Sequence, residues 1–309
     1  MSEVTTKNHN ARFTAPTQWQ AELLTANPLF ADLCQLFPFG NQSDFPTITE
    51  LNQWLAFHQP QVAMQFVGDE VLAADGRYYE VFIHQTGQIP TRQQNWHDLF
   101  GALIWCLFPN TKTLLNQLHM QEIKLHGQQQ RSKLRNKLTL LDECGVILAY
   151  SPAATALIEQ LQQHQWQAAF VSKRHCWRTA SADNTGSRSA DDCLARAQLM
   201  PLMFGHANYE MATRPFIGLT GKLLALPVAD DFWQLSLGQR YAVIDSALSL
   251  QIANSDYLLQ AAQLTPLPLL GVPGWYAANT GADFYLDQQY FRPLPLHRRA
   301  ALPLNRESE

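Results

Sequence analysis

The 309-residue sequence lacks long hydrophobic runs, and its N-terminus lacks the apolar segment of a secretory signal. The longest strongly apolar stretch, ALIWCLF, is far shorter than the roughly 20 residues that a membrane-spanning helix needs. Both absences predict a cytoplasmic protein without a membrane partner.

Neither sign of charge is in excess, since 22 Lys and Arg residues stand against 26 Asp and Glu residues, a formal net charge of −4. The composition therefore lacks the global basic signature of nucleic-acid-binding proteins. The five cysteines are widely spaced and include no C-x-x-C pair. This spacing argues against a disulfide framework and against a thiolate zinc site, so we expect reduced, mainly structural thiols.

The signature motifs of several large enzyme superfamilies are also missing. The sequence contains no Walker A loop, no G-x-G-x-x-G after a strand, no G-x-S-x-G elbow and no H-E-x-x-H. These absences disfavour P-loop nucleotide hydrolases, Rossmann oxidoreductases, α/β-hydrolases and zincins.

The organisation of the chain is predicted from its composition and periodicity. Residues 1–15 are polar and aperiodic and predict a disordered lead, 16–300 predict a single globular domain, and 301–309 form a tail. Within the domain, the polar segment 173–191 predicts a mobile surface loop. We expect an α+β fold, mostly helical, with one or two small, mainly antiparallel sheets.

Individual elements follow from apolar spacing. Helices are predicted within 43–58 and 238–255, and a short strand within 218–228. Three further predictions bear on the candidate site. Segments 61–70 and 77–87 are predicted as two strands of a hairpin, 137–151 as a strand pair that turns at Cys144–Gly145, and 194–214 as a helix broken near Pro201.

A helix is predicted to begin after Asn95, whose side chain is suited to cap it. Asp98, three residues later, is expected to reach back to the cap. Pro109 ends this helix and a second one follows. Polar residues recur on the second helix at steps of three and four and so share one face: Lys112, Asn116, His119, Glu122 and His126.

Several blocks of the chain resemble a bacterial family known as domain of unknown function 3025. The blocks are IPTRQQNWHDLFGALIW, FPNTKTLLNQLH, RNKLTLLDECGV, FGHANYE, GLTGK and LLGVPGWYAAN with FYLDQQYFRP, and they occur in order from about Ile89 to Pro293. The resemblance implies one architecture for most of the chain. It implies no particular activity.

Histidines and carboxylates provide the candidates for chemistry. His206 and Glu210 are four residues apart on one helix face, where they would chelate one ion or form an internal hydrogen-bonded pair. His97 lies in the first turn of its helix, where the helix dipole favours a neutral imidazole suited to act as a base or ligand; a solvent-facing His without a role is the plain alternative. His119 is a weaker candidate ligand on a polar face.

Asp142 and Glu143 form an acidic pair that either serves turn chemistry or points one carboxylate into a site. A basic run lies between residues 124 and 137 and includes Arg135. Such a run is either a solvated face or a contact for a phosphate or a nucleic-acid backbone, although it lacks interleaved aromatics for base stacking.

Two hypotheses result. The first is a hydrolase that uses one divalent metal ion on an anionic, phosphoester-type substrate. Its catalytic groups would be His97, Asp142 and Glu143, its substrate-binding groups Arg92, Asn95 and Arg135, and its metal ligands His119, His206 and Glu210. The second is a non-catalytic binding or scaffold protein whose basic run 124–137 contacts an acidic partner or RNA. The first requires the histidines to converge, whereas the second leaves them scattered beside a basic surface stripe.

Overall fold

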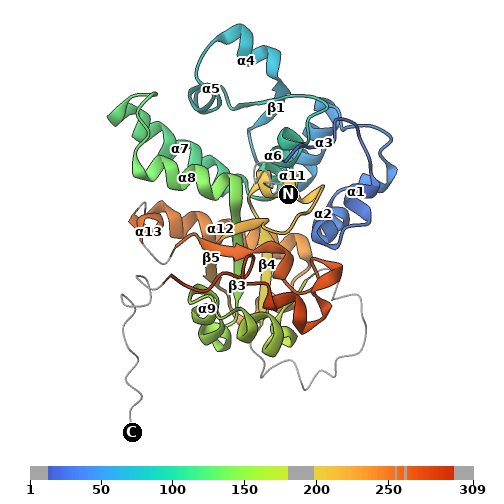
Figure 1. Ribbon diagram of the computed structural model, residues 1–309. Helices are drawn as coiled ribbons and strands as arrows, with labels where there is room; N and C mark the ends of the chain where they lie inside the picture. The colour runs from blue at the N-terminus through green and yellow to red at the C-terminus, as the bar shows by residue number, and fades with distance from the viewer. Residues whose placement is uncertain (1–12, 180–197, 255, 261–262, 296–309) are drawn as a thin grey trace, which may run out of the picture.

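The computed structural model describes residues 13–179, 198–254, 256–260 and 263–295. Within these residues helices dominate and surround two small sheets, so the predicted α+β class is confirmed (Figure 1). None of the described helices is both long and apolar enough to cross a membrane. The helices are α1 (Glu22–Thr25), α2 (Ala31–Leu36), α3 (Ile48–His58), α4 (Asp69–Asp75), α5 (Tyr79–Thr86), α6 (Trp96–Leu107), α7 (Pro109–His126), α8 (Lys133–Cys144), α9 (Thr155–Gln162), α11 (His206–Ala212), α12 (Leu237–Ala253) and α13 (Asp256–Leu259).

Two sheets link these helices. The smaller sheet pairs two strands in parallel, β1 (Gln65–Gly68) and β2 (Gln88–Thr91). The larger sheet has the order β4-β3-β5-β6, formed by β3 (Gly145–Tyr150), β4 (Leu199–Met203), β5 (Thr220–Pro227) and β6 (Thr265–Pro268). In it, β3 runs parallel to β5, while the β3–β4 and β5–β6 pairs are antiparallel.

The helix predicted after Asn95 is α6, and it lies in the core. The Asn95 side chain accepts a hydrogen bond from the Asp98 main-chain nitrogen at 3.0 Å, as a cap does. Asp98 itself does not return to the cap; its carboxylate accepts from the main chain and the guanidinium of Arg92. The next helix, α7, begins at Pro109, and Asp245 of α12 accepts from two main-chain nitrogens of its first turn. The predicted helices α3 and α12 and strand β5 are confirmed as well.

The hairpin predicted between residues 61 and 87 is wrong. β1 and β2 are parallel, and parallel strands need a long crossover, which α4 and α5 provide. Gly76 (φ +77°) and Gly87 (φ +69°) end these two helices in the left-handed conformation. Packing of the buried Phe82 and Ile83 side chains outweighs the strand propensity of this tyrosine- and valine-containing run.

The strand pair predicted around Cys144 is also wrong. Residues up to Cys144 form α8, which Ser132 caps by accepting from the Arg135 nitrogen at 3.1 Å, and only the residues from Gly145 onward form a strand. Asp142 and Glu143 therefore lie in the last turn of a helix. Neighbours on a helix point about 100° apart rather than to opposite faces, so both carboxylates can face one site.

The segment 199–203, predicted as part of a helix, is strand β4. Each of its five residues is buried, so the strand shows none of the polar alternation that would distinguish it from a buried helix. The helical part of that prediction holds from His206, where α11 begins.

One continuous hydrophobic core extends from Leu24 near the N-terminus to Phe291 near the C-terminus. In the predicted loop 173–191, residues Arg174–Cys176 form a 3-10 turn. The rest of that loop from residue 180, most of the predicted N-terminal lead and the tail 301–309 lie outside the described residues.

Candidate functional site

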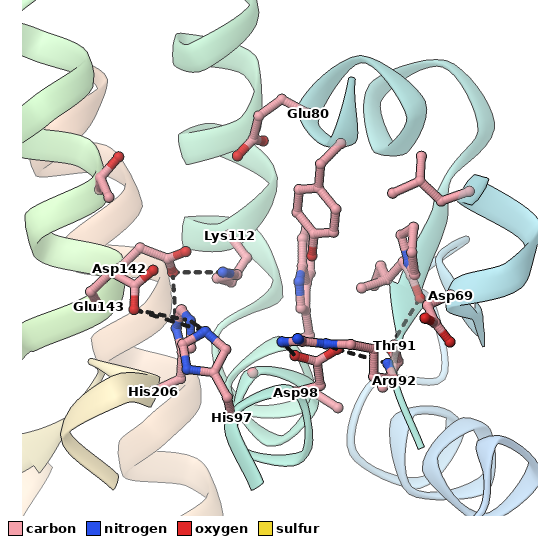
Figure 2. A pocket seen from close by; sticks show the side chains of 18 of the residues that line it. Asp69, Glu80, Thr91, Arg92, His97, Asp98, Lys112, Asp142, Glu143 and His206 are labelled. Carbon is pink, nitrogen blue, oxygen red and sulfur yellow. Dashed lines mark hydrogen bonds and ion pairs between the residues drawn. The ribbon is translucent and has the colours of Figure 1, made fainter. Parts of the chain in front are cut away.

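A cavity of about 450 Å³ opens between the α4–α5 crossover and the helices α6, α7 and α8, with the start of α11 at one end (Figure 2). Its walls combine charged, imidazole and aromatic groups. The charged and imidazole groups are Asp69, Glu80, Arg92, His97, Asp98, Lys112, His119, Arg131, Asp142, Glu143 and His206, and the aromatic ones are Tyr78, Tyr79 and Trp105.

Three side chains from three helices converge at one end of this cavity. The Nε2 atoms of His97 and His206 are 3.1 Å apart, and the Glu143 Oε2 atom lies 3.5 Å from the His206 Nε2 and 3.9 Å from the His97 Nε2. Figure 2 shows the three side chains pointing toward one another. Among the residues that the structure describes, this is the one group of three His, Cys, Asp or Glu side chains with the spacing of a metal site.

The three separations match the size of a tetrahedral metal centre. Zinc bonds of about 2.0–2.2 Å place neighbouring ligand atoms roughly 3.4 Å apart. A point equally distant from the two Nε2 atoms and the Glu143 oxygen lies about 2.1 Å from each of them. The side chains therefore fit a divalent ion without rearrangement of the backbone.

A glycine brings these helices close together. A Cβ atom on Gly205 would lie 2.5 Å from the main-chain oxygen of Glu143 and 2.6 Å from the Cys144 Cα, so a larger residue would push α11 away from α8. The main-chain nitrogens of Phe204 and Gly205 both donate to the Gly145 oxygen, at 3.0 and 2.8 Å. Pairing of β3 with β4 thus places the first residue of α11 beside the last turn of α8.

Two further carboxylates lie behind the histidines. Glu210, one turn after His206 on α11, lies with its Oε2 3.1 Å from the His97 Nδ1. Because a carboxylate only accepts, Nδ1 of His97 donates in this pair, and Nε2 is the ring nitrogen that faces the other two groups. The Asp142 Oδ1 lies 3.9 Å from the His206 Nδ1 and accepts from Lys112 Nζ at 2.6 Å. A carboxylate hydrogen-bonded to an imidazole ligand, as Glu210 is to His97, orients the ring and increases its basicity.

The two imidazoles differ in their acid–base properties. The hydrogen bond to Glu210 raises the pKa of His97 above its usual value, and the charge of Glu143 raises it further. Desolvation lowers this pKa, but by less. Burial lowers the pKa of His206, and its Nδ1 is a buried atom without a hydrogen-bond partner among the described residues. Burial opposes ionisation of Asp142, yet its pKa lies below the usual value because the charge and hydrogen bond of Lys112 outweigh that penalty.

Carboxylates outnumber cations around the cavity. Two of the three cations are already neutralised, since Arg92 pairs with Asp98 at 2.7 Å and Lys112 with Asp142 at 2.6 Å. Glu143 and Glu210 remain near the histidines with no Lys or Arg partner among the described residues. Their side chains are 36% and 23% exposed, so solvent screens part of this charge, and a bound cation would compensate the rest.

The remaining predicted site residues are distributed as follows. Arg92 lines the cavity with about half of its side chain exposed, and Asn95 serves as the α6 cap outside the cavity. His119 lines the cavity but lies outside the group of three, and burial lowers its pKa to about 4. Arg135 is buried away from the cavity, where its guanidinium donates to three main-chain oxygens of the α7–α8 connection and to the Tyr78 hydroxyl.

The basic run 124–137 therefore does not form an unbroken exposed stripe, because Arg135 is in the interior. The structure also adds cavity residues that were not predicted as site residues, above all Lys112 and Glu80. Lys112 was visible as part of the polar face of α7. That face proves to be buried at Lys112, Asn116 and His119, and polar residues on a buried helix face are a signal of a site.

The comparisons with known proteins place the chain in a family. A family model described as a protein of unknown function (DUF3025) matches residues 64–186 and 188–295. Because these residues make up most of the chain, the protein belongs to this family, and the resemblance noted in the sequence is confirmed. Neither the curated proteins nor the solved structures yield a significant match.

Proposed function

We propose that this protein is a metal-dependent hydrolase that acts on an anionic small molecule of the phosphoester type. The observation that carries the proposal is the triangle of His97, His206 and Glu143 ligand atoms, whose sides of 3.1, 3.5 and 3.9 Å suit one divalent ion at the end of a cavity.

The ligand set supports a catalytic rather than a structural ion. Two imidazoles and one carboxylate leave a coordination position open toward the cavity, as in catalytic zinc sites, whereas structural zinc is closed by four protein ligands. A bound ion would supply Lewis acidity and lower the pKa of a water molecule. Glu210 would hold the His97 imidazole in the orientation that the ion requires, and the charge of Asp142, 3.9 Å from the His206 Nδ1, would act on the second imidazole.

The cavity supports a small substrate. A volume of about 450 Å³ is in the range of small-molecule sites. The exposed Arg131 lies on its wall and would attract an anionic group that also contacts the ion, whereas Arg92 is paired with Asp98. Trp105, whose ring centroid lies 5.3 Å from Lys112 Nζ, adds an aromatic group to the lining.

The first test is elemental analysis by mass spectrometry of the untagged protein and of two variants. We expect about one zinc, manganese or iron per chain in the wild type, its loss in His206→Ala, and its retention in His126→Ala. His126 is a suitable control because it is an exposed α7 histidine that pairs with Glu122 outside the cavity.

The metal-loaded protein should then hydrolyse simple phosphoesters, and His206→Ala should not. Absence of metal even after incubation with zinc, manganese or iron would contradict the proposal. That result would favour the alternative hypothesis, a non-catalytic binding protein.

A further inference from the structure

Glu80 is a carboxyl group that faces the same cavity from α5, on the wall opposite the proposed ion (Figure 2). Figure 2 shows it above Lys112, with His97 and His206 below. Asn116 of α7 fixes its position, because one amide nitrogen donates to the Glu80 Oε2 at 2.6 Å and to the Glu80 main-chain oxygen at 2.9 Å. The side chain is therefore held in place.

The surroundings of Glu80 favour the protonated form. Its Oε1 has no hydrogen-bond partner in the part of the chain that the structure describes, and no Lys or Arg there forms an ion pair with it. Desolvation and the negative charge of Asp142 raise the pKa of Glu80. The Asn116 hydrogen bond and the positive charges of Lys112 and Arg135 lower it by less, so the pKa is raised overall. A carboxyl group in such a site keeps its proton to a higher pH than an ordinary glutamate does.

A metal ion held by His97, His206 and Glu143 and a carboxyl group on the opposite wall would divide the work of hydrolysis. We infer that Glu80 is the general acid of the hydrolysis proposed above, on which this inference rests, and that the substrates are phosphoesters of alcohols. The fixed position of Glu80 and its partner-free oxygen in the cavity provide the geometry that a proton donor needs.

In the proposed step, every bond, electron pair and proton is accounted for. The oxygen of a water molecule forms a bond to phosphorus while the bond from phosphorus to the ester oxygen breaks. The electron pair of that bond stays on the departing oxygen, which takes the proton of Glu80 and leaves as an alcohol. The proton lost by the attacking water goes to the product phosphate or to solvent, and solvent reprotonates Glu80. No oxidant or further reactant is needed.

The role of Glu80 depends on the leaving group. An alkoxide is a poor leaving group and needs a proton as it departs, whereas 4-nitrophenolate is stable as an anion. Benzyl phosphate and 4-nitrophenyl phosphate are similar in size and differ chiefly in this respect. The methyl diesters of the same two compounds can also be prepared, so that both phosphomonoesters and phosphodiesters are tested.

The experiment compares kcat/KM of wild type and Glu80→Gln on both esters with saturating zinc or manganese. We expect Glu80→Gln to slow benzyl ester hydrolysis by roughly 10²–10⁴-fold and 4-nitrophenyl ester hydrolysis by less than about tenfold. The ratio of the two rates in one sample is independent of the folded fraction, so partial unfolding of the variant cannot imitate this result. Glu70→Gln is the matched control, since Glu70 is an exposed carboxylate of α4 outside the cavity lining.

Two outcomes would overturn the role of Glu80, and they differ in what they imply for the proposed hydrolase function. Equal slowing of both esters by Glu80→Gln, with active wild type, would show that Glu80 supports the site without donating a proton, and the hydrolase proposal would stand. Metal-loaded wild type that hydrolyses neither ester would overturn the proposed function and the role of Glu80 with it.

Discussion

The Glu210→Gln substitution removes the charge behind His97 and leaves the three proposed ligand atoms in place. Glu210 Oε2 lies 3.1 Å from the His97 Nδ1. Glu210 is not one of the three side chains, His97, Glu143 and His206, that have the spacing of a metal site. Loss of such a partner typically lowers metal affinity by roughly 10–100-fold, or about 1.4–2.7 kcal/mol. Because glutamine still offers an oxygen acceptor and both side chains are partly exposed, we expect about tenfold for Glu210→Gln and a larger loss for Glu210→Ala.

The pH dependence provides a second check with a defined sign. Glu210 raises the pKa of His97 above 6.5, so in the wild type a proton competes with the ion and metal affinity falls as the pH drops through that pKa. Glu210→Gln lowers the same pKa and weakens this competition. The difference in affinity between variant and wild type should therefore be larger at pH 8 than at pH 6.

The assay is a zinc titration of purified apoprotein against a chromophoric chelator at both pH values. Glu122→Gln is the matched control, because Glu122 lies 3.8 Å from His126 on α7, outside the cavity. Unchanged affinity in Glu210→Gln would refute the orienting role. A loss far above a hundredfold would instead make Glu210 a direct ligand, as its spacing from His206 first indicated.

Two further predictions concern packing. Gly205→Ala should destabilise the protein by about 1–3 kcal/mol in urea unfolding and weaken zinc binding, because its Cβ would lie 2.5 Å from the Glu143 oxygen; Gly281→Ala, with no neighbour within 4 Å, should do neither. Arg135→Ala should lower the free energy of unfolding by about 1–3 kcal/mol, because it removes a buried guanidinium that donates to four acceptors, with KM unchanged below the unfolding temperature. A raised KM at unchanged stability would restore the substrate-binding role first expected of Arg135.

The elements that were predicted correctly are those with local signals. The helix α6 has an Asn95 cap, a continuous apolar stripe and a proline just after its end, and each of these acts within a few residues. Two of the failures, at β4 and α5, concern short runs, and the third is the end of helix α8, which was predicted as a strand. Strand β4 is buried along its whole length and α5 contains strand-favouring residues, so periodicity could not separate strand from helix.

In the candidate site, too, local signals predicted the residue types but not which of them lie together. The sequence singled out His97, His206, Glu210 and the pair Asp142–Glu143, because titratable groups beside apolar helical turns are costly without a role. It could not show that His97 and Glu143, expected as catalytic groups, rather than the expected ligands His119 and Glu210, join His206 in the group of three. That outcome depends on α8 continuing as a helix to Cys144 and on Gly205 allowing close contact with it.

By itself, the sequence determined the fold class and most of the chemical groups in the site, because composition, caps and helical spacing are local properties, and its sequence blocks carried the resemblance to the family. Only the tertiary structure decided which groups meet. His97 and His206 are 109 residues apart in the chain, and their Nε2 atoms come to 3.1 Å because strand pairing and core packing position α6, α8 and α11. Long-range contacts of this kind leave no periodic trace in a single sequence, and for the same reason Glu80 could be placed opposite them only in the folded protein.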